Sequence, residues 1–383
     1  MSADKPQGQA QARAGGDCDR EKAQPLSVEQ AIDVLLAHAH PVTYTEQVPV
    51  AQARNRVLAE PLTSRIDMPI WDNSAMDGYA LCAADAATHA GQLRVAQRIP
   101  AGSCGTPLAP GTAARIFTGA PLPDGADTVV MQEDSAVDGD LVQVPNDLDT
   151  GANVRRRGED LRAGDVLLSA GRRLAPQHLG LAASVGVPDL TVTRRLRVAF
   201  VASGDELVMP GSPLAPGQIY NSNRFLFSAL LEALGCTVID LGIVEDRLEA
   251  TVEALTAAAD QADLVLASGG VSVGDEDHVR PAVERLGSLD LWRVAMRPGK
   301  PLAFGHIGDT PFIGSPGNPV SLFVTFCLFA RPFILRMQGV TGDLRPLHLP
   351  VRAGFDWPTP TLSLIHISEP TRPELVSRIQ SSS

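Results

Sequence analysis

The sequence predicts a multidomain α/β protein, in which a doubly wound, mostly parallel sheet is joined to a small all-β domain. Two observations predict this fold class. From Arg197 onward, apolar runs of strand length alternate with amphipathic helical stretches, the pattern of a parallel sheet covered by helices. Between residues 61 and 144, short β-like stretches instead follow one another between Gly and Pro turns, with no helix of useful length. Such spacing is typical of an all-β domain.

The amino-terminal half begins with a polar tail and one amphipathic helix. Residues 1–24 are rich in Gly, Gln and charged side chains and are expected to form a disordered tail. Order is predicted to begin at Ser27, which forms a capping box with Gln30, and this helix is expected to end before Pro41. A second helix is predicted at 175–187. The β-like stretches of the all-β domain are 78–84, 93–102, 114–121, 127–133 and 141–145.

The carboxy-terminal half contains the alternating strands and helices. Residues 197–203 form a continuous apolar run, as expected for a strand buried on both faces. A helix is predicted at 222–235 and ends at Gly235, because glycine readily adopts the left-handed conformation that follows a helix end. The remaining predicted elements are strand 237–243, helix 247–261, strand 263–268, helix 279–285, strands 302–304 and 310–313, and an apolar helix at 319–337.

Composition places the chain among ordinary globular proteins and limits its partners. Its 383 residues suffice for two to four domains, and 44% of them are hydrophobic. The formal net charge of −12 argues against nucleic acid as a partner, because phosphate contacts need a basic surface. A small anion could still bind at a local basic cluster.

The cysteines and the apolar segments predict a cytoplasmic protein. The five cysteines contain no C-x-x-C pair, so neither a zinc site nor a disulfide framework is expected. Residues 1–23 lack the apolar core of a secretory signal. The apolar run 319–337 is interrupted by Arg331 and Pro332, so it is interpreted as a buried helix and no membrane partner is expected. The cysteines are Cys18, Cys82, Cys104, Cys236 and Cys327.

Acidic residues follow three successive predicted strands of the parallel sheet. Asp205 and Glu206 follow the first strand, Asp246 follows the second, and residues 275–277 follow the third. The carboxyl ends of parallel strands meet at one edge, where ligands bind at the topological switch point. Some of these acids could simply be helix caps or turn residues, but acids after all three strands favour a functional site. Carboxylates beside phosphates are what Mg²⁺ requires.

The same edge carries candidates for anion binding. The loop "SGGVSVGDED" at 268–277 precedes a predicted helix, so its N–H groups could receive a phosphate. It lacks the motifs of a P-loop and of a dinucleotide site, and a strand-to-helix turn needs glycine in any case. Arg297 and Lys300 flank a Pro-Gly turn and could bind an anion. A basic turn exposed to solvent explains these two residues equally well. A further small-residue turn, "SPGNP", begins at Ser315.

Two further motifs lie outside the α/β domain. The stretch "WDNSAMDGYA" at 71–80 mixes aromatic and polar groups around Asp72, which could form no more than an Asx turn. The stretch "NVRRRGED" at 153–160 places three arginines beside Glu159 and Asp160. These charges favour either a cluster of surface ion pairs or a clamp for an anion.

Together these stretches resemble one family, the molybdopterin molybdenumtransferases of the MoeA and gephyrin E-domain group. The resemblance covers roughly residues 26–340 and implies a molybdopterin-binding-like α/β domain. It also implies a transferase that inserts molybdenum from molybdate into adenylylated molybdopterin, with release of AMP in a Mg²⁺-dependent step, to form molybdenum cofactor. The motifs that carry it are "DNSAMDGYA", "RIFTGAPLPDGADTVVMQE", "NVRRRGED", "SGDEL", "GQIYNSN", "SGGVSVGDED", "RPGKP" and "GSPGNPVS".

The resemblance also implies roles for individual positions. The implied catalytic residues are Asp72, Thr118, Arg155, Asp160, Glu206, Asp246 and Asp277. Glu206, Asp246 and Asp277 are also the implied metal ligands. The implied binding positions are Gly269, Gly270 and Ser272 for the pterin phosphate, Arg297 and Lys300 for molybdate, and Arg293 and Ser315 nearby. The family often carries Lys where this chain has Arg293 and Arg297, and the broader guanidinium changes the geometry of that pocket.

The family is an elongated dimer, so the resemblance implies a homodimer whose site is shared between subunits. Asp72, Thr118, Arg155 and Asp160 are then expected to act across the interface, and a molybdopterin adenylyltransferase is a further candidate partner. The implied organisation is a disordered tail at 1–24, an elongated linking and dimerisation domain at 25–60 and 145–195, a small β domain at 61–144, an α/β domain at 196–340, and the start of a truncated C-terminal β domain at 341–360.

The end of the sequence departs from the family pattern. Residues 361–383 have no family counterpart, and "LSLIHISEPTRP" resembles a translated sequencing adapter. We therefore expect 361–383 to be a non-native tail that replaces most of the last domain and impairs activity.

Two other functional classes are weighed against the transferase. A gephyrin-like scaffold is disfavoured because the sequence contains no long Pro-rich linker and no fused adenylyltransferase domain. A CinA-like hydrolase of nucleotides or pterins would share the α/β domain alone. The motifs at 72–80 and 153–160 lie outside that domain and therefore argue against it.

Overall fold

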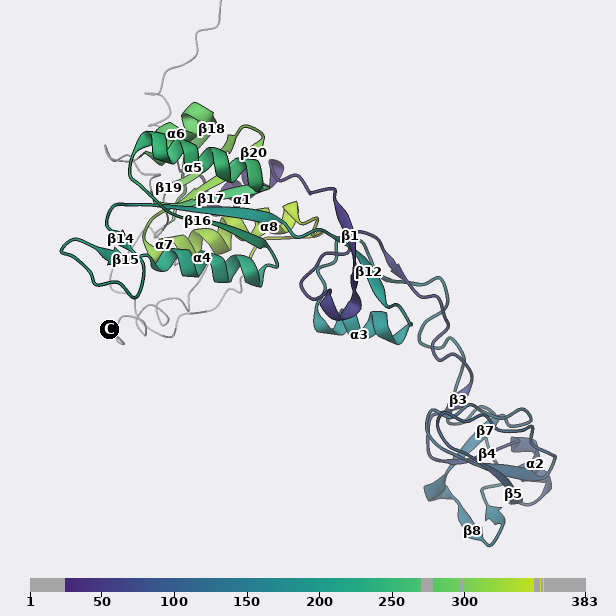
Figure 1. The fold of residues 1–383 in the computed structure, drawn as a ribbon. Coiled ribbons are helices and arrows are strands. Elements are labelled where there is room, and N and C mark those ends of the chain that lie inside the picture. Colours follow the sequence, from purple (N-terminus) through teal and green to yellow (C-terminus); the bar gives the residue numbers. More distant parts are fainter. Residues whose placement is uncertain are drawn as a thin grey trace, which may run out of the picture. The chain divides into compact units, whose positions relative to one another are not determined.

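The computed structural model describes residues 25–269, 278–296, 299, 301–347, 352 and 354. The chain forms two compact units, which are described separately (Figure 1). Unit one comprises residues 1–45, 55–57 and 193–383, and unit two comprises residues 46–54 and 58–192.

Unit one contains a six-stranded sheet in the order β16-β13-β17-β20-β19-β18. The first four strands in this order are parallel, and β19 and β18 continue the sheet in antiparallel fashion. The predicted mostly parallel sheet is therefore confirmed. Strand β18 occupies a segment where no strand was predicted. The strands are β13 (Arg197–Ser203), β16 (Thr237–Val244), β17 (Leu264–Ser268), β18 (Gly287–Arg293), β19 (Pro301–Ile307) and β20 (Thr310–Ser315), with a separate parallel pair of β14 (Leu207–Val208) and β15 (Ile219–Tyr220).

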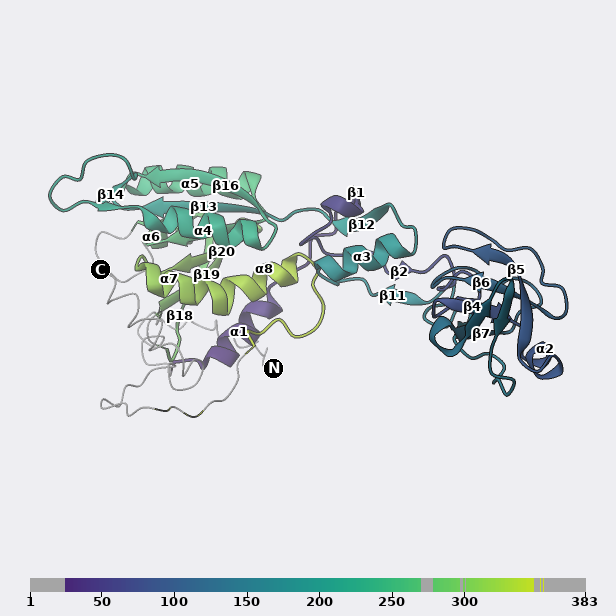
Figure 2. The ribbon, with the colours of Figure 1, turned by 90° about the horizontal axis from the view of Figure 1, so that it is seen from below.

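Helices cover both faces of this sheet (Figures 1 and 2). Alternate residues of one strand enter different cores: Phe200 packs with α1, α4 and the helices after β20, whereas Val201 packs with α5 and α6. This alternation is the consequence of a pleated strand buried on both faces. The helices are α1 (Val28–Ala37), α4 (Ser222–Ala233), α5 (Leu248–Gln261), α6 (Val279–Leu286), α7 (Pro319–Thr325), the π-helix η4 (Phe326–Ala330) and α8 (Arg331–Met337).

Two local predictions in unit one are confirmed by the backbone. Ser27 and Gln30 form the predicted capping box at the start of α1. Gly235 follows Leu234, the C-cap of α4, and has a φ of +81°. Both features are short-range, so sequence patterns suffice to predict them.

The apolar run Pro319–Met337 forms α7, η4 and α8 in succession and has the length and composition of a membrane span. However, 67% of its apolar window is buried inside the protein. Phe326, Phe329 and Phe333 are each at most 1% exposed and belong to the core shared with α1 and the sheet. The run is therefore a core helix, as interpreted from the sequence.

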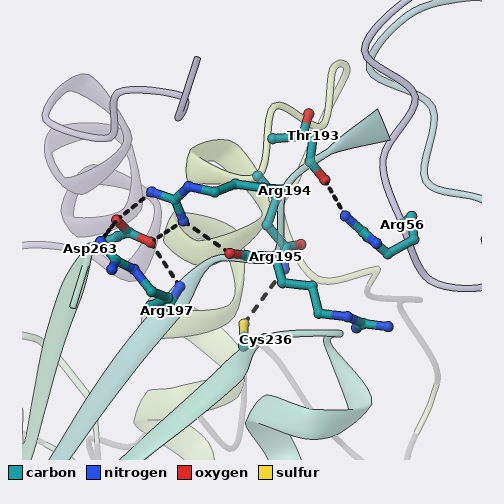
Figure 3. A network of polar contacts seen from close by, with 8 residues as sticks. Arg56, Thr193, Arg194, Arg195, Arg197, Cys236 and Asp263 are labelled. Carbon is teal, nitrogen blue, oxygen red and sulfur yellow. Dashed lines mark hydrogen bonds and ion pairs between the residues drawn. The ribbon is translucent and has the colours of Figure 1, made fainter. Parts of the chain in front are cut away.

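A polar network lies at the amino ends of the parallel strands (Figure 3). Asp263 accepts hydrogen bonds from both terminal nitrogens of Arg194, at 2.7 Å each, and from the backbone N–H of Arg197 at 2.8 Å. Arg56 is buried and donates to the carbonyl oxygen of Thr193 at 2.8 Å. This end of the sheet is therefore held by structural ion pairs and hydrogen bonds.

Unit two contains a second six-stranded sheet in the order β7-β4-β6-β5-β9-β8. Its pairs are antiparallel except for β5 and β6. Successive residues again alternate between two cores, since Val129 and Val130 belong to different clusters. The strands are β4 (Gly78–Leu81), β5 (Gln92–Ile99), β6 (Thr112–Ile116), β7 (Thr128–Met131), β8 (Ala136–Asp138) and β9 (Leu141–Gln143), with the short helix η3 (Gln132–Asp134) after β7.

One helix interrupts this region, where only strands were expected. The predicted β-like stretch 78–84 ends at Leu81, and α2 (Ala83–Thr88) begins directly after it. The carboxylate of Asp127 accepts the backbone N–H of Ala83 at 2.9 Å. Because this cap comes from a residue distant in the sequence, the local pattern does not reveal the helix.

The remaining elements of unit two form a smaller core and three strand pairs. Leu58, Leu174 and Val192 are each at most 2% exposed and pack in this core. The boundaries of the linking domain and of the other implied domains remain predictions, although α1 packs into unit one. The elements are β1 (Thr45–Pro49) paired with β12 (Asp189–Thr193), β2 (Leu62–Thr63) with β11 (Val166–Leu168), β3 (Asn73–Ser74) with β10 (Val154–Arg155), the short helix η2 (Val50–Gln52) and α3 (Pro176–Ser184).

Candidate functional site

The carboxyl ends of the four parallel strands of unit one lie level with one another. Ser268 at the end of β17 is paired with Ala202 on one side and with Ser315 on the other. Ser203 at the end of β13 is paired with Val244 of β16. The loops that carry the predicted acids and glycines therefore leave the sheet at one edge, which we call the rim.

The topological switch point of the sheet falls between β13 and β17. From β13 the chain passes to β16 on one side and then to β17 on the other. Gly269 lies at this point with a φ of +83°, and a Cβ there would stand 3.4 Å from the carbonyl oxygen of Ser203. Its N–H donates to the carbonyl oxygen of Ser315 at 3.1 Å. Ligands of such sheets bind in the crevice at this position.

Three acids gather beside the switch point. The side chain of Asp246 accepts a hydrogen bond from the Ser203 hydroxyl at 3.3 Å, and its backbone N–H donates to the Asp205 carboxylate at 3.3 Å. The Glu206 carboxylate folds back on Gly204, where a Cβ would stand 2.5 Å from Oε2 of Glu206. Two of the predicted metal ligands, Glu206 and Asp246, thus belong to adjacent loops of the rim.

Asn223 at the start of α4 joins two loops of the rim. Its Nδ2 donates to the Ser268 hydroxyl and to the carbonyl oxygen of Gly317, both at 2.7 Å. Its Oδ1 is buried and accepts no hydrogen bond from the described residues. A buried acceptor without a partner indicates a place for a donor group of a ligand. The reasoning from sequence did not single out Asn223, although the motif "GQIYNSN" that contains it was noted.

The remaining binding residues divide into two groups. Ser315 is buried at the end of β20, and Arg293 is exposed at the end of β18. Since β18 and β20 run in the same direction, Arg293 also lies at the rim. The predicted residues Gly270, Ser272, Asp277, Arg297 and Lys300 lie outside the described residues.

The residues predicted in unit two form a second cluster. The pairing of β3 with β10 places Asn73 opposite Arg155 and so brings the motifs "DNSAMDGYA" and "NVRRRGED" together. The Asp72 carboxylate accepts from the Arg156 side chain at 2.7 Å and from the Arg157 N–H at 2.8 Å. Arg155 forms an ion pair with Asp160.

These partners keep Asp72 ionised. The hydrogen bond from the Arg157 N–H lowers the pKa of Asp72 most strongly. Burial acts in the opposite direction, and the side chain and charge of Arg156 lower the pKa further. The net result is a pKa below the ordinary value of 3.8. Asp72 therefore enters any reaction near neutral pH as an anion and an acceptor.

Thr118 lies in the same unit and is held by an acid that sequence reasoning missed. Its N–H and its hydroxyl both donate to Oδ1 of Asp77, at 2.8 Å each. The N–H of Gly119 donates to the Ser74 carbonyl, which ties the Thr118 loop to β3. Asp77 belongs to "DNSAMDGYA", so its motif was visible, but nothing local indicated that it binds Thr118.

The donor set at the rim suits a hard divalent cation. Within the described ranges, no three His, Cys, Asp or Glu side chains form a ready-made metal cluster. Mg²⁺ does not need one, because it is usually bound by one or two carboxylates together with waters and substrate phosphates. Glu206 and Asp246 supply such oxygens beside the switch point. The residues present therefore fit Mg²⁺.

Comparison with known proteins identifies the family. Residues 26–186 match the family described as the MoeA N-terminal region (domain I and II), and residues 199–336 match a probable molybdopterin binding domain. The molybdopterin molybdenumtransferase of Haemophilus influenzae is 42% identical over 325 residues, covering 84% of this chain and 80% of that protein. The chain belongs to the molybdopterin molybdenumtransferase family. The predicted transferase class is thereby confirmed, as is a role in molybdenum cofactor biosynthesis.

Other relatives agree with this assignment. The molybdopterin molybdenumtransferase of a Nostoc species is 41% identical, over 81% of this chain and 73% of that protein. A crystal structure of the molybdopterin biosynthesis MoeA protein from Pyrococcus horikosii superimposes with a TM-score of 0.70 at 32% identity, covering 83% of this chain and 81% of that chain. The predicted multidomain α/β fold is confirmed as the MoeA fold. A CinA-like protein would share only the α/β domain, whereas the match to the MoeA family includes residues 26–186.

Proposed function

We propose that this molybdenumtransferase inserts molybdenum from molybdate into adenylylated molybdopterin and releases AMP. The observation that carries the proposal is the rim, where Glu206 and Asp246 stand beside the glycine loop at Gly269. A substrate with a phosphoanhydride needs N–H donors for its phosphates and acids for a cation. Glu206 and Asp246 supply the acids beside Gly269 at the switch point of the sheet. The relatives of the chain are named molybdopterin molybdenumtransferase, which supports the transfer of molybdenum.

Each part of the rim has a distinct task in this proposal. Glu206 and Asp246 would hold Mg²⁺, which when bound neutralises the charge that develops as the phosphoanhydride is cleaved. We propose that the segment beginning at Gly269, a residue that lies close to Ser203, binds a phosphate of the pterin. Arg293 supplies positive charge for molybdate at the far end of the rim.

The cluster in unit two contributes fixed charges to the same reaction. Asp72 and Asp160 are each paired with an arginine, which orients both carboxyl groups. We propose that these groups and Thr118 bind the adenylylated substrate. We further propose that the chain acts as a homodimer in the cytoplasm and receives its substrate from a molybdopterin adenylyltransferase.

Release of AMP tests the proposal directly. Purified protein is incubated with adenylylated molybdopterin and Mg²⁺, with and without molybdate, and AMP is measured by liquid chromatography. We expect AMP and molybdenum cofactor in the presence of molybdate, and loss of both in Glu206→Gln. AMP release that is independent of molybdate would identify a hydrolase instead, and binding of the pterin without any turnover would favour a scaffold.

A further inference from the structure

Thr118 and Asp77 form a paired contact on the surface of unit two. Thr118 follows β6, and Asp77 directly precedes β4, the neighbouring strand. Oδ1 of Asp77 accepts both the backbone N–H and the side-chain hydroxyl of Thr118, at 2.8 Å each. Both residues are exposed, so a ligand can reach the hydroxyl.

This contact determines what the Thr118 hydroxyl can offer to a ligand. A hydroxyl has one proton to donate and two lone pairs that accept. The proton of Thr118 is already given to Asp77. An ionised carboxylate has no proton to return. The outward side of Oγ1 therefore presents only lone pairs, and Thr118 acts as an acceptor.

The surroundings of Asp77 keep it ionised and in place. The N–H and the hydroxyl of Thr118 are the largest influences and lower the pKa of Asp77, burial opposes them, and the charge of Arg115 lowers it further. Arg115 donates to the carbonyl oxygen of Gly78 at 2.9 Å, and its guanidinium lies 4.7 Å from the centre of the Phe117 ring. A fixed cation thus stands beside the Asp77–Thr118 pair.

We infer that Asp77 is a positioning residue that makes Thr118 an acceptor for a hydrogen-bond donor of the substrate. This inference rests on the proposed function. The group that Thr118 binds is then a donor on the adenylate, which is a ribose hydroxyl or the adenine amino group, or else a pterin N–H. Phosphate and molybdate oxygens are excluded because they would themselves need a donor. Asp77 acts through Thr118 and does not contact the substrate.

A double-mutant cycle tests the inference through KM. Thr118→Val removes the hydroxyl with little change of shape, and Asp77→Ala releases the hydroxyl proton. We expect each to raise KM for adenylylated molybdopterin about tenfold, as for one lost charge-assisted contact, with a smaller change in kcat. The KM of the double variant should be no higher than that of Thr118→Val alone. If the two increases of KM multiply in the double variant, the residues act independently and the inference is overturned.

Conservative variants and a matched control separate positioning from folding. Thr118→Ser keeps the hydroxyl and should retain the wild-type KM. Asp77→Asn keeps an acceptor oxygen, so its KM should rise only about threefold. Asp85 caps a backbone N–H of the same unit, that of Gly111 at 2.8 Å. Asp85→Ala should leave KM unchanged. A rise of KM equal to that in Asp77→Ala would overturn the inference.

Two further readouts can be measured without turnover: AMP binding locates the donor, and the amide shift of Thr118 reports its contact with Asp77. If the donor lies on the adenylate, Thr118→Val weakens AMP binding in calorimetry; if it is a pterin N–H, AMP binding is unchanged although KM rises in the kinetic test. The amide proton of Thr118 should lie downfield in the NMR spectrum of the wild type and move upfield in Asp77→Asn. An unchanged amide shift would overturn the inference even in an active enzyme, whereas the proposed function fails if the wild type releases no AMP with molybdate or releases AMP without it.

Discussion

The carboxylate of Asp263 receives one hydrogen bond from each terminal nitrogen of Arg194, both at 2.7 Å. The Asp263 side chain is 11% exposed and that of Arg194 is 23% exposed, so this pair is largely removed from water. Asp263 also accepts the N–H of Arg197, the first residue of β13. The pair therefore secures the start of the central strand, at the end of the sheet opposite the rim.

We predict that Asp263→Ala lowers the free energy of unfolding of unit one by about 2 kcal/mol. The substitution removes the carboxylate that neutralises the partly buried Arg194 guanidinium, which costs more than the loss of an exposed ion pair. Urea unfolding followed by circular dichroism measures the change. Glu284→Ala is the control, since the exposed pair of Glu284 with Arg280 should contribute only a few tenths of a kcal/mol. Equal losses in the two variants would refute the prediction.

The same pair predicts a pH dependence of stability. Burial raises the pKa of Asp263, but the hydrogen bonds and charges of Arg194 and Arg197 outweigh it and lower the pKa below 3.8. A carboxyl whose pKa is lowered by folding stabilises the fold fully at pH values above its pKa in the unfolded state. This stabilisation is lost as the pH falls through its pKa in the folded state. The stability difference between wild type and Asp263→Asn should therefore be constant from pH 7 to about 5 and shrink below about pH 4. A difference that grows in acid would contradict this assignment.

We predict that Gly235→Ala destabilises unit one by about 1–2 kcal/mol. The residue adopts a φ of +81° after α4, and a Cβ there would stand 3.1 Å from the carbonyl oxygen of Asn55. The left-handed conformation alone costs about 1 kcal/mol in a residue with a side chain. Gly339→Ala is a matched control: it follows α8 with a φ of +86° but meets only a side-chain atom at 3.6 Å. In thermal melts, the melting temperature of Gly235→Ala should be lower than that of Gly339→Ala.

We predict that Asp246→Asn lowers kcat for AMP release at least a hundredfold and raises the Mg²⁺ concentration needed for half-maximal rate. The amide keeps the shape and can still accept from the Ser203 hydroxyl, but it lacks the charge that holds the cation. Asp240→Asn is the control, because Asp240 lies on β16 and pairs with Arg224 at 2.5 Å. A normal Mg²⁺ requirement in Asp246→Asn would remove Asp246 from the proposed metal site.

We predict that Asp72→Ala reduces AMP release while leaving the thermal stability of unit two nearly unchanged. The ion pair of Asp72 with Arg156 is substantially exposed on both sides, so it contributes less than about 1 kcal/mol. Arg156→Ala tests whether the charge of Asp72 matters alone or through its partner. If both variants unfold several degrees earlier than the wild type, the cluster is structural and its role in binding is refuted.

Residue patterns within single elements were sufficient for much of the fold. The apolar run of β13, the capping box of α1 and Gly235 after α4 all follow from contacts within a few residues. Strand β18 was missed although Leu289 and Leu291 alternate with Ser288 and Asp290, the pattern of a strand, which here pairs with β19. Helix α2 was missed because its cap, Asp127, comes from a distant strand end.

At the site, too, local motifs predicted some features and contacts between distant residues decided the others. The family motifs identified Glu206, Asp246, Asp72 and Thr118 as candidates, since a motif records residue type and order. A motif does not record which side chains meet. Asp77 binds Thr118 across two strands, and Asn223 joins the loops after β17 and β20.

Residue order and hydrophobic pattern thus specified the class of fold, the family and the chemistry that the motifs permit. Strand pairing in three dimensions decided that Ser203, Ser268 and Ser315 end at one edge, and that the Thr118 hydroxyl gives its proton to Asp77. The physical reason is the range of the interactions. Caps and periodicity act over a few residues, whereas hydrogen bonds between strands join residues that only the folded chain brings within 3 Å.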